Sequence, residues 1–78
     1  MILDTRLREV REGQFLTQQE LAERSGVAKV TIARIETGTT TPMLSTIRRL
    51  AIALGVEPAA LVPDPSTLRR KSGPENVS

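Results

Sequence analysis

The sequence predicts an all-α fold, a compact bundle of four to five short helices. Apolar residues recur at intervals of three and four from Leu7 to Leu61, which is the period of amphipathic helices. Glycines follow several of these periodic runs, where they are suited to end a helix. Alternation of apolar and polar residues, the pattern of a half-buried strand, is not seen. A helical bundle is therefore the expected architecture.

Each expected helix has its own boundary signals. The expected helices span 5–14, 18–24, 28–36, 43–54 and 57–61. Thr17 and Glu20 have the spacing of a capping box at the start of the second helix. Gly26 is suited to end that helix, because glycine takes a positive φ without strain. Pro58 is suited to the first position of the last helix.

The apolar positions on these helices predict an aliphatic core, since Phe15 is the only aromatic residue. The expected core residues are Leu7, Val10, Leu16, Leu21, Val27, Ile32, Ile35, Leu44, Ile47, Leu50, Leu54 and Leu61.

Composition excludes several kinds of function. The chain has no cysteine and no histidine, so thiolate chemistry, disulfides and the commonest metal ligand are absent. The carboxylate pairs Glu9/Glu12 and Glu20/Glu23 are interpreted as solvated or capping groups. We therefore expect no enzymatic activity, no cofactor and no metal. With 11 basic and 9 acidic residues, the net charge of +2 only weakly favours a nucleic acid.

The chain is expected to divide into a domain at 1–62 and a flexible tail at 63–78. The tail contains three prolines, one glycine and three serines, and too few apolar residues to build a core. Its basic triplet Arg69-Arg70-Lys71 is interpreted as solubilising or, alternatively, as a phosphate contact. A signal peptide or an apolar run of about 18 residues is not seen, so a cytoplasmic protein is expected.

The second and third expected helices, with the tight glycine turn between them, form the frame of a helix-turn-helix over about 18–37. Such a unit places its second helix in the major groove of DNA, so one face must be apolar and the other free. Ile32 and Ile35 are expected to point inward. The residues left outside are Lys29, Val30, Ala33, Arg34 and Thr37.

An ordered set of motifs strongly resembles the Cro/CI-like phage repressor family, also called the xenobiotic-response-element or lambda-repressor-like family. The resemblance covers about residues 3–62. Its motifs are Leu16-Thr17-Gln18-Gln19-Glu20-Leu21-Ala22, Ser25-Gly26-Val27, Thr31-Ile32-Ala33-Arg34-Ile35-Glu36-Thr37-Gly38, Pro42, Leu50-Ala51 and Leu54-Gly55-Val56.

The resemblance implies roles for individual side chains. The implied base-reading residues are Lys29, Val30 and Arg34. The implied phosphate contacts are Gln18, Thr31, Thr37, Thr39 and Thr40. Arg11 and Glu36 match a partly buried ion pair of the family. The alternative for Arg34 and Lys29 is a solvated surface charge, and Val30 is equally well interpreted as a tolerated exposed residue.

Three positions depart from the family pattern. Ala28 and Met43 stand where a polar cap is usual, and for the fourth helix Thr41 is expected to cap instead, with Pro42 first in the helix. Phe15 replaces the glycine usual after the first helix, so it must avoid a positive φ or accept strain.

The function expected from this resemblance is a transcriptional regulator, a repressor that binds double-stranded DNA at a palindromic operator as a homodimer. The dimer surface is expected near the last two helices, with Leu61 and Val62 pairing across a twofold axis. One alternative is an antitoxin whose tail wraps a toxin protein. Others are a controller of a restriction-modification operon and an interaction module that has lost DNA binding.

Overall fold

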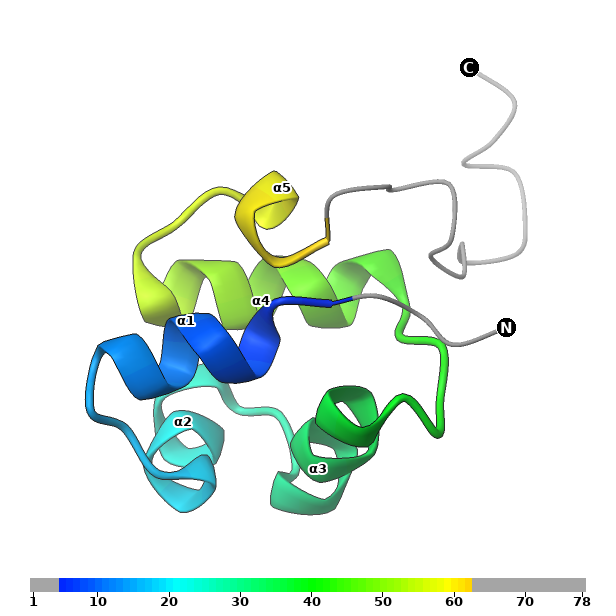
Figure 1. The fold of residues 1–78 in the computed structure, drawn as a ribbon, viewed down its shortest axis with the longest axis horizontal. Coiled ribbons are helices and arrows are strands. Elements are labelled where there is room, and N and C mark those ends of the chain that lie inside the picture. Colours follow the sequence, from blue (N-terminus) through cyan, green and yellow to red (C-terminus); the bar gives the residue numbers. More distant parts are fainter. Residues whose placement is uncertain (1–4, 63–78) are drawn as a thin grey trace.

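In the computed structural model, which describes residues 5–62, the chain forms five helices and no strand (Figure 1). The helices are α1 (Leu7–Gly13), α2 (Gln18–Ser25), α3 (Lys29–Thr37), α4 (Leu44–Leu54) and α5 (Pro58–Leu61). The predicted all-α class is therefore confirmed. The tail expected at 63–78 and residues 1–4 lie outside the described part of the chain.

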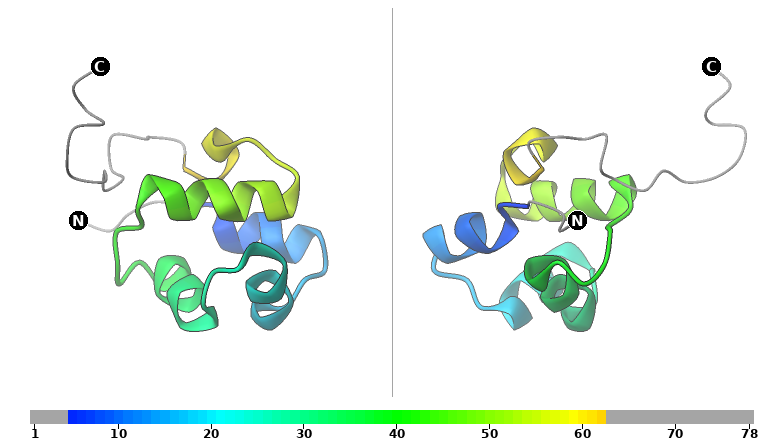
Figure 2. Two further views of the ribbon diagram at one scale, coloured as in Figure 1. Left: turned by 180° about the vertical axis from the view of Figure 1, so that it is seen from behind. Right: turned by 45° about the vertical axis from the view of Figure 1, so that its right-hand side comes forward.

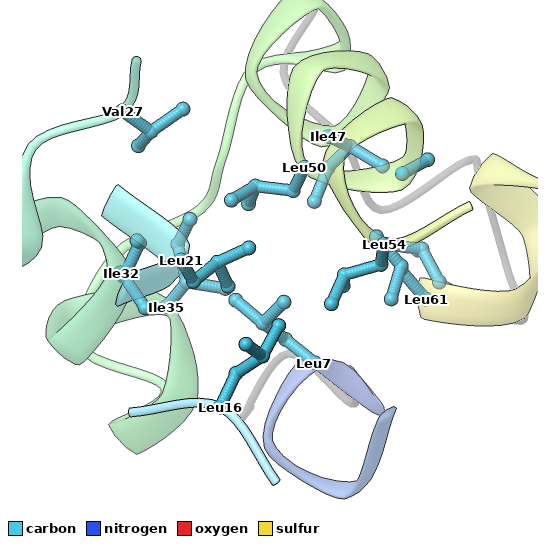
Figure 3. Packing of buried hydrophobic residues seen from close by; sticks show 12 residues of the cluster. Leu7, Leu16, Leu21, Val27, Ile32, Ile35, Ile47, Leu50, Leu54 and Leu61 are labelled. Atoms are coloured by element: carbon cyan, nitrogen blue, oxygen red, sulfur yellow. The ribbon is translucent and has the colours of Figure 1, made fainter. Parts of the chain in front are cut away.

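Helix α4 lies in the middle of the bundle. Figures 1 and 2 show α5 on one side of it and the pair α2 and α3 on the other, with α1 between α4 and α2. Side chains from all five helices and the segments between them meet around α4 (Figure 3). The buried apolar residues of this cluster are Leu7, Leu16, Leu21, Val27, Ile32, Ile35, Ile47, Leu50, Ala51, Leu54, Leu61 and Val62.

Most of the predicted core is confirmed, with two exceptions. Val10 is only partly buried and packs against the edge of the cluster. Leu44 is also partly buried, because it is the first residue of α4 and lies at the end of the apolar stripe. Ala51 and Val62, which the prediction omitted, are buried in the core instead.

The helix starts agree only in part with the expected caps. The capping box of α2 is confirmed: the Glu20 amide donates to Thr17 Oγ1 at 3.0 Å, and the Thr17 amide donates to Glu20 Oε1 at 2.8 Å. The hydrogen bond from the Thr17 amide is the main reason why the pKa of Glu20 is lowered. The cap expected at Thr41 is wrong, because Met43 is the N-cap of α4 and Pro42 precedes it.

Helix α1 begins two residues later than expected. The Arg6 amide donates to the Leu61 carbonyl at 2.7 Å, which ties the chain before α1 to α5. Thr5 and Arg6 lie outside the helix, and Arg6 is its N-cap. As expected, Ala28 precedes α3 without a side-chain cap, and α5 begins at Pro58.

Three helices end in the same backbone motif, in which a residue of positive φ reverses the chain. The amides of Leu16, Thr39 and Val56 each donate to a carbonyl five residues earlier, at 3.2, 2.9 and 3.0 Å. This is the Schellman arrangement, in which glycine is usual at the residue of positive φ. Gly38 and Gly55 supply that residue after α3 and α4. After α1 it is Phe15, with φ 59° and a side chain 93% exposed.

Phe15 thus accepts the strain that its position imposes, and the structure shows what holds it there. The next residue, Leu16, is buried in the core. The Leu16 carbonyl accepts a hydrogen bond from Arg11 Nη1 at 2.7 Å. The burial of Leu16 and this hydrogen bond hold the chain in place after the turn. They thereby keep the backbone of Phe15 at its positive φ.

We expect Phe15→Gly to raise the free energy of unfolding by about 1 kcal/mol. Relief of left-handed strain, roughly 1–2 kcal/mol, exceeds the entropy that glycine adds to the unfolded chain. Urea unfolding measures the change. Phe15→Ala is the matched control, because it removes the same exposed ring but keeps Cβ. Equal stability of the two variants would contradict strain at this turn.

Candidate nucleic-acid interface

The turn between α2 and α3 is short and rigid. Gly26 ends α2 with φ 75°, and its amide donates to the Ala22 carbonyl at 2.9 Å. The Val27 amide donates to Ser25 Oγ at 3.1 Å, and the Val27 side chain is buried in the core. These contacts fix the direction in which the chain enters α3. The pair α2 and α3 therefore has the geometry that the glycine turn predicts.

Helix α3 has one buried face and one exposed face. Ile32 and Ile35 are 0% and 1% exposed and point into the core (Figure 3). Lys29, Val30 and Arg34 are exposed on the other face. The predicted orientation of the helix is thus present, and the three side chains expected to read bases are available to a groove. Their contacts with bases stay a prediction.

A buried carboxylate joins α3 to the two preceding helices. The side chain of Glu36 is 0% exposed. Arg11 of α1 donates to both of its oxygens, from Nε to Oε2 at 2.7 Å and from Nη2 to Oε1 at 3.0 Å. Gln18 of α2 donates from Nε2 to Oε1 at 2.9 Å. The ion pair expected between Arg11 and Glu36 is therefore present, and it includes a third helix.

The electrostatics of this cluster favour its charged form. Burial is the largest influence on Glu36 and raises the pKa of its carboxyl, but the hydrogen bonds from Arg11, Gln18 and Arg8 and the charge of Arg11 together outweigh burial. The net result is a pKa of Glu36 below its ordinary value. The hydrogen bond with Glu36 also raises the pKa of Arg11. Both groups remain ionised at neutral pH.

Gln18, predicted to hold a phosphate, lies at the first position of α2 and is half-buried. One hydrogen of its amide is committed to Glu36. The same nitrogen carries a second hydrogen, which is free by valence to reach a ligand. Glu36 thus orients Gln18, and the phosphate contact stays a prediction.

The threonines expected to contact phosphates divide into two groups. The hydroxyl of Thr37 donates to the Ala33 or Arg34 carbonyl at 3.0 or 3.2 Å, and that of Thr39 donates to the Arg34 carbonyl at 3.2 Å. These two hydroxyls therefore satisfy backbone carbonyls in the last turn of α3. Thr31, on α3, and Thr40, in the segment after it, are half-buried. For all four, contact with phosphate stays a prediction.

Two side chains of α1 and the turn after it make contacts that the sequence analysis did not predict. Arg8 lies one turn before Arg11 on α1, and its Nε is 3.5 Å from Glu36 Oε1. The spacing of three residues places both arginines on one side of the helix, which is the signal that was available. Gln14 Nε2 donates to the Leu54 carbonyl at 2.7 Å and so ties the end of α1 to the end of α4.

Within residues 5–62, acidic side chains do not gather in a group suited to a metal ion. In the same part of the chain, none of the five helices has the length and apolar character needed to cross a membrane.

Comparison with protein families matches residues 7–61 to the helix-turn-helix family. Among curated relatives, the immunity repressor protein of Bacillus phage phi105 is 30% identical over 97% of this chain. The transcriptional repressor RstR of the cryptic phage CTXphi, from Vibrio cholerae, is 38% identical over 85% of this chain. The chain spans 53% of the first protein and 60% of the second.

Among solved structures, the restriction-modification controller protein C.AhdI from Aeromonas hydrophila has a similar fold. The TM-score is 0.68 and the sequence identity is 38%. The match covers 70% of this chain and 83% of the controller.

We expect Arg11→Ala to lower the free energy of unfolding by about 3–5 kcal/mol, because it leaves the carboxylate of Glu36 buried without its main partner. Urea unfolding at neutral pH measures the loss. Arg48→Ala on α4 is the matched control, since Arg48 is exposed, and its effect should stay within about 0.5 kcal/mol. A loss of similar size in both variants would contradict the role of the pair.

Stability should also depend on pH through Glu36. Its pKa is lower in the folded chain than its ordinary value of 4.5. The contribution of Glu36 to stability is therefore complete above its ordinary pKa. This contribution is lost as the pH falls through the lowered pKa of the folded chain. Urea midpoints between neutral and acidic pH should fall more steeply for the native chain than for Glu36→Gln. Parallel curves would show that Glu36 does not contribute.

Proposed function

The chain belongs to the helix-turn-helix family, and on this premise we propose that it is a sequence-specific DNA-binding transcriptional regulator. We further infer that it is a repressor that acts in the cytoplasm and binds a palindromic operator as a homodimer. The proposal rests on helix α3, which has one buried face and one exposed face. Its apolar face is anchored by Ile32 and Ile35, while Lys29, Val30 and Arg34 remain exposed.

The exposed face of α3 is suited to the major groove, which admits one helix and presents a distinct pattern for each base pair. Arg34 is assigned to the O6 and N7 acceptors of a guanine, the commonest specific contact. Lys29 is assigned to a guanine or a phosphate. Val30, which is 54% exposed, is assigned to a thymine methyl group.

Contacts with the DNA backbone are assigned to residues around the ends of α2 and α3. Gln18 has one amide hydrogen left after its bond to Glu36, and this hydrogen is assigned to a phosphate. Thr31 and Thr40 are assigned to phosphates through hydroxyls or amides. Thr37 and Thr39 reach a phosphate only if their hydroxyl hydrogens turn away from the carbonyls at the end of α3.

The proposed homodimer is supported by the usual geometry of operator recognition. One copy presents one reading helix, and two half-sites one helical turn apart require two copies. The pairing expected of Leu61 and Val62 is wrong for this structure, because both are buried within the chain, at 0% and 1% exposure. The exposed apolar residues of α4 and α5 are Ile52, Ala59 and Ala60, and we place the dimer surface there.

Repression is supported by the names of two relatives, which are an immunity repressor and a transcriptional repressor. A second candidate is control of a restriction-modification operon, because the chain matches 83% of the controller C.AhdI. The antitoxin interpretation depends on the tail at 63–78, which lies outside the described residues.

Selection of bound duplexes from a random pool tests the proposal as a whole. A homodimer of reading helices should recover an inverted repeat, with half-site centres about 34 Å apart along the DNA. Selection of a single unrepeated site would contradict the dimer, and failure to enrich any sequence would contradict specific recognition.

Arg34→Ala should lose about 1–3 kcal/mol of discrimination at one base pair of each half-site, because it removes a paired contact to a base edge. Binding of the selected duplex and of single-base variants measures this by fluorescence anisotropy. Arg48→Ala is the control, since Arg48 is an exposed arginine on α4. Unchanged discrimination in Arg34→Ala would show that Arg34 does not read a base.

A further inference from the structure

Arg8 is a basic side chain to which no DNA contact has been assigned. Arg8 lies on α1, outside the helix-turn-helix, and its side chain is 53% exposed. Its Nε is 3.5 Å from Glu36 Oε1, at the outer limit of a hydrogen bond. Arg11, by contrast, holds both oxygens of the same carboxylate and has a side chain only 10% exposed. The charge of Glu36 is therefore satisfied mainly by Arg11.

The position of Arg8 is fixed by the oxygen that it shares with Gln18. Arg8 Nε lies 3.5 Å and Gln18 Nε2 lies 2.9 Å from Glu36 Oε1, so the two nitrogens are within 6.4 Å of each other. A phosphate group has oxygens pointing in several directions, and each accepts hydrogen bonds at about 2.7–3.2 Å. One phosphate can therefore bridge donors at this separation.

The weak pairing of Arg8 also leaves its guanidinium able to change partners. The Arg8 side of this ion pair is exposed and the distance is long, so water screens the contact and the long side chain loses freedom to make it. A phosphate offers more, because arginine forms short, charge-assisted hydrogen bonds with its oxygens. Exchange of Glu36 for a phosphate leaves Glu36 paired with Arg11 and Gln18.

Resting on the proposed function, we propose that Arg8 binds a phosphate of the DNA backbone, the one that Gln18 also contacts. Its guanidinium turns from Glu36 to that phosphate when DNA binds. The interface thereby extends from α2 and α3 onto α1. Arg8 contributes to affinity for any duplex and not to the choice of sequence, because phosphates carry no sequence information directly.

The salt dependence of binding to a short duplex of mixed sequence tests this assignment without knowledge of the operator. Each phosphate contact adds about 0.9 to the slope of log affinity against log salt. Because a homodimer loses two such contacts, the slope should fall by about 1.8. Between about 50 and 200 mM salt, the loss of affinity of Arg8→Ala should therefore be about 12 times smaller than that of the native chain. Arg8→Lys keeps the charge and should restore the native slope.

Arg6→Ala is the matched control and should keep the native slope, because Arg6 is an exposed arginine just before α1 to which no DNA contact is assigned. The thermal unfolding midpoint of Arg8→Ala should stay close to that of the native chain. A native slope in Arg8→Ala, with or without a lowered midpoint, would overturn the assignment and leave Arg8 as a structural partner of Glu36. Absence of duplex binding by the native chain itself would overturn the proposed function instead.

Discussion

The buried carboxylate of Glu36 is the constraint on which the arrangement of the first three helices depends. An ionised carboxylate at 0% exposure is stable only with partners in fixed directions, and Arg11 and Gln18 supply them from α1 and α2. The aliphatic core cannot set directions in this way, because apolar burial is non-directional. The ionic cluster therefore fixes how α2 and α3 are oriented relative to each other, and the core supplies most of the driving force.

The same cluster makes the unusual turn after α1 possible. Short helices packed into a small domain need abrupt ends, and α1, α2, α3 and α4 are each followed by a residue of positive φ. Three of these residues are glycines, while the fourth, after α1, is Phe15. Arg11 contacts both Glu36 and the Leu16 carbonyl, so one guanidinium holds the ion pair and the chain after the turn. Strain at Phe15 is thus offset by a side chain four residues earlier.

Local signals in the sequence were sufficient for the fold, and less so for the site. The period of apolar residues, the capping box at Thr17 and the glycines after α2, α3 and α4 each act within a few residues, so the helices were predicted to within about two residues. Contacts between distant segments were not predictable in this way. The bond from Arg6 to Leu61 joins the two ends of the domain, and the burial of Leu61 and Val62 removed them from the expected dimer surface. The hydroxyls of Thr37 and Thr39 likewise close α3, which composition alone does not reveal.

Separation of the two faces of α3 explains how such a small domain can carry specificity. Ile32, Ile35 and Glu36 hold the helix through apolar and ionic contacts on one side. Lys29, Val30 and Arg34 lie on the other side and are not part of the core. Replacement of these three side chains changes what the helix presents to a groove at little cost to folding, since exposed substitutions usually alter stability by less than about 0.5 kcal/mol. The fold therefore constrains the position of the reading helix and leaves its chemistry free to vary.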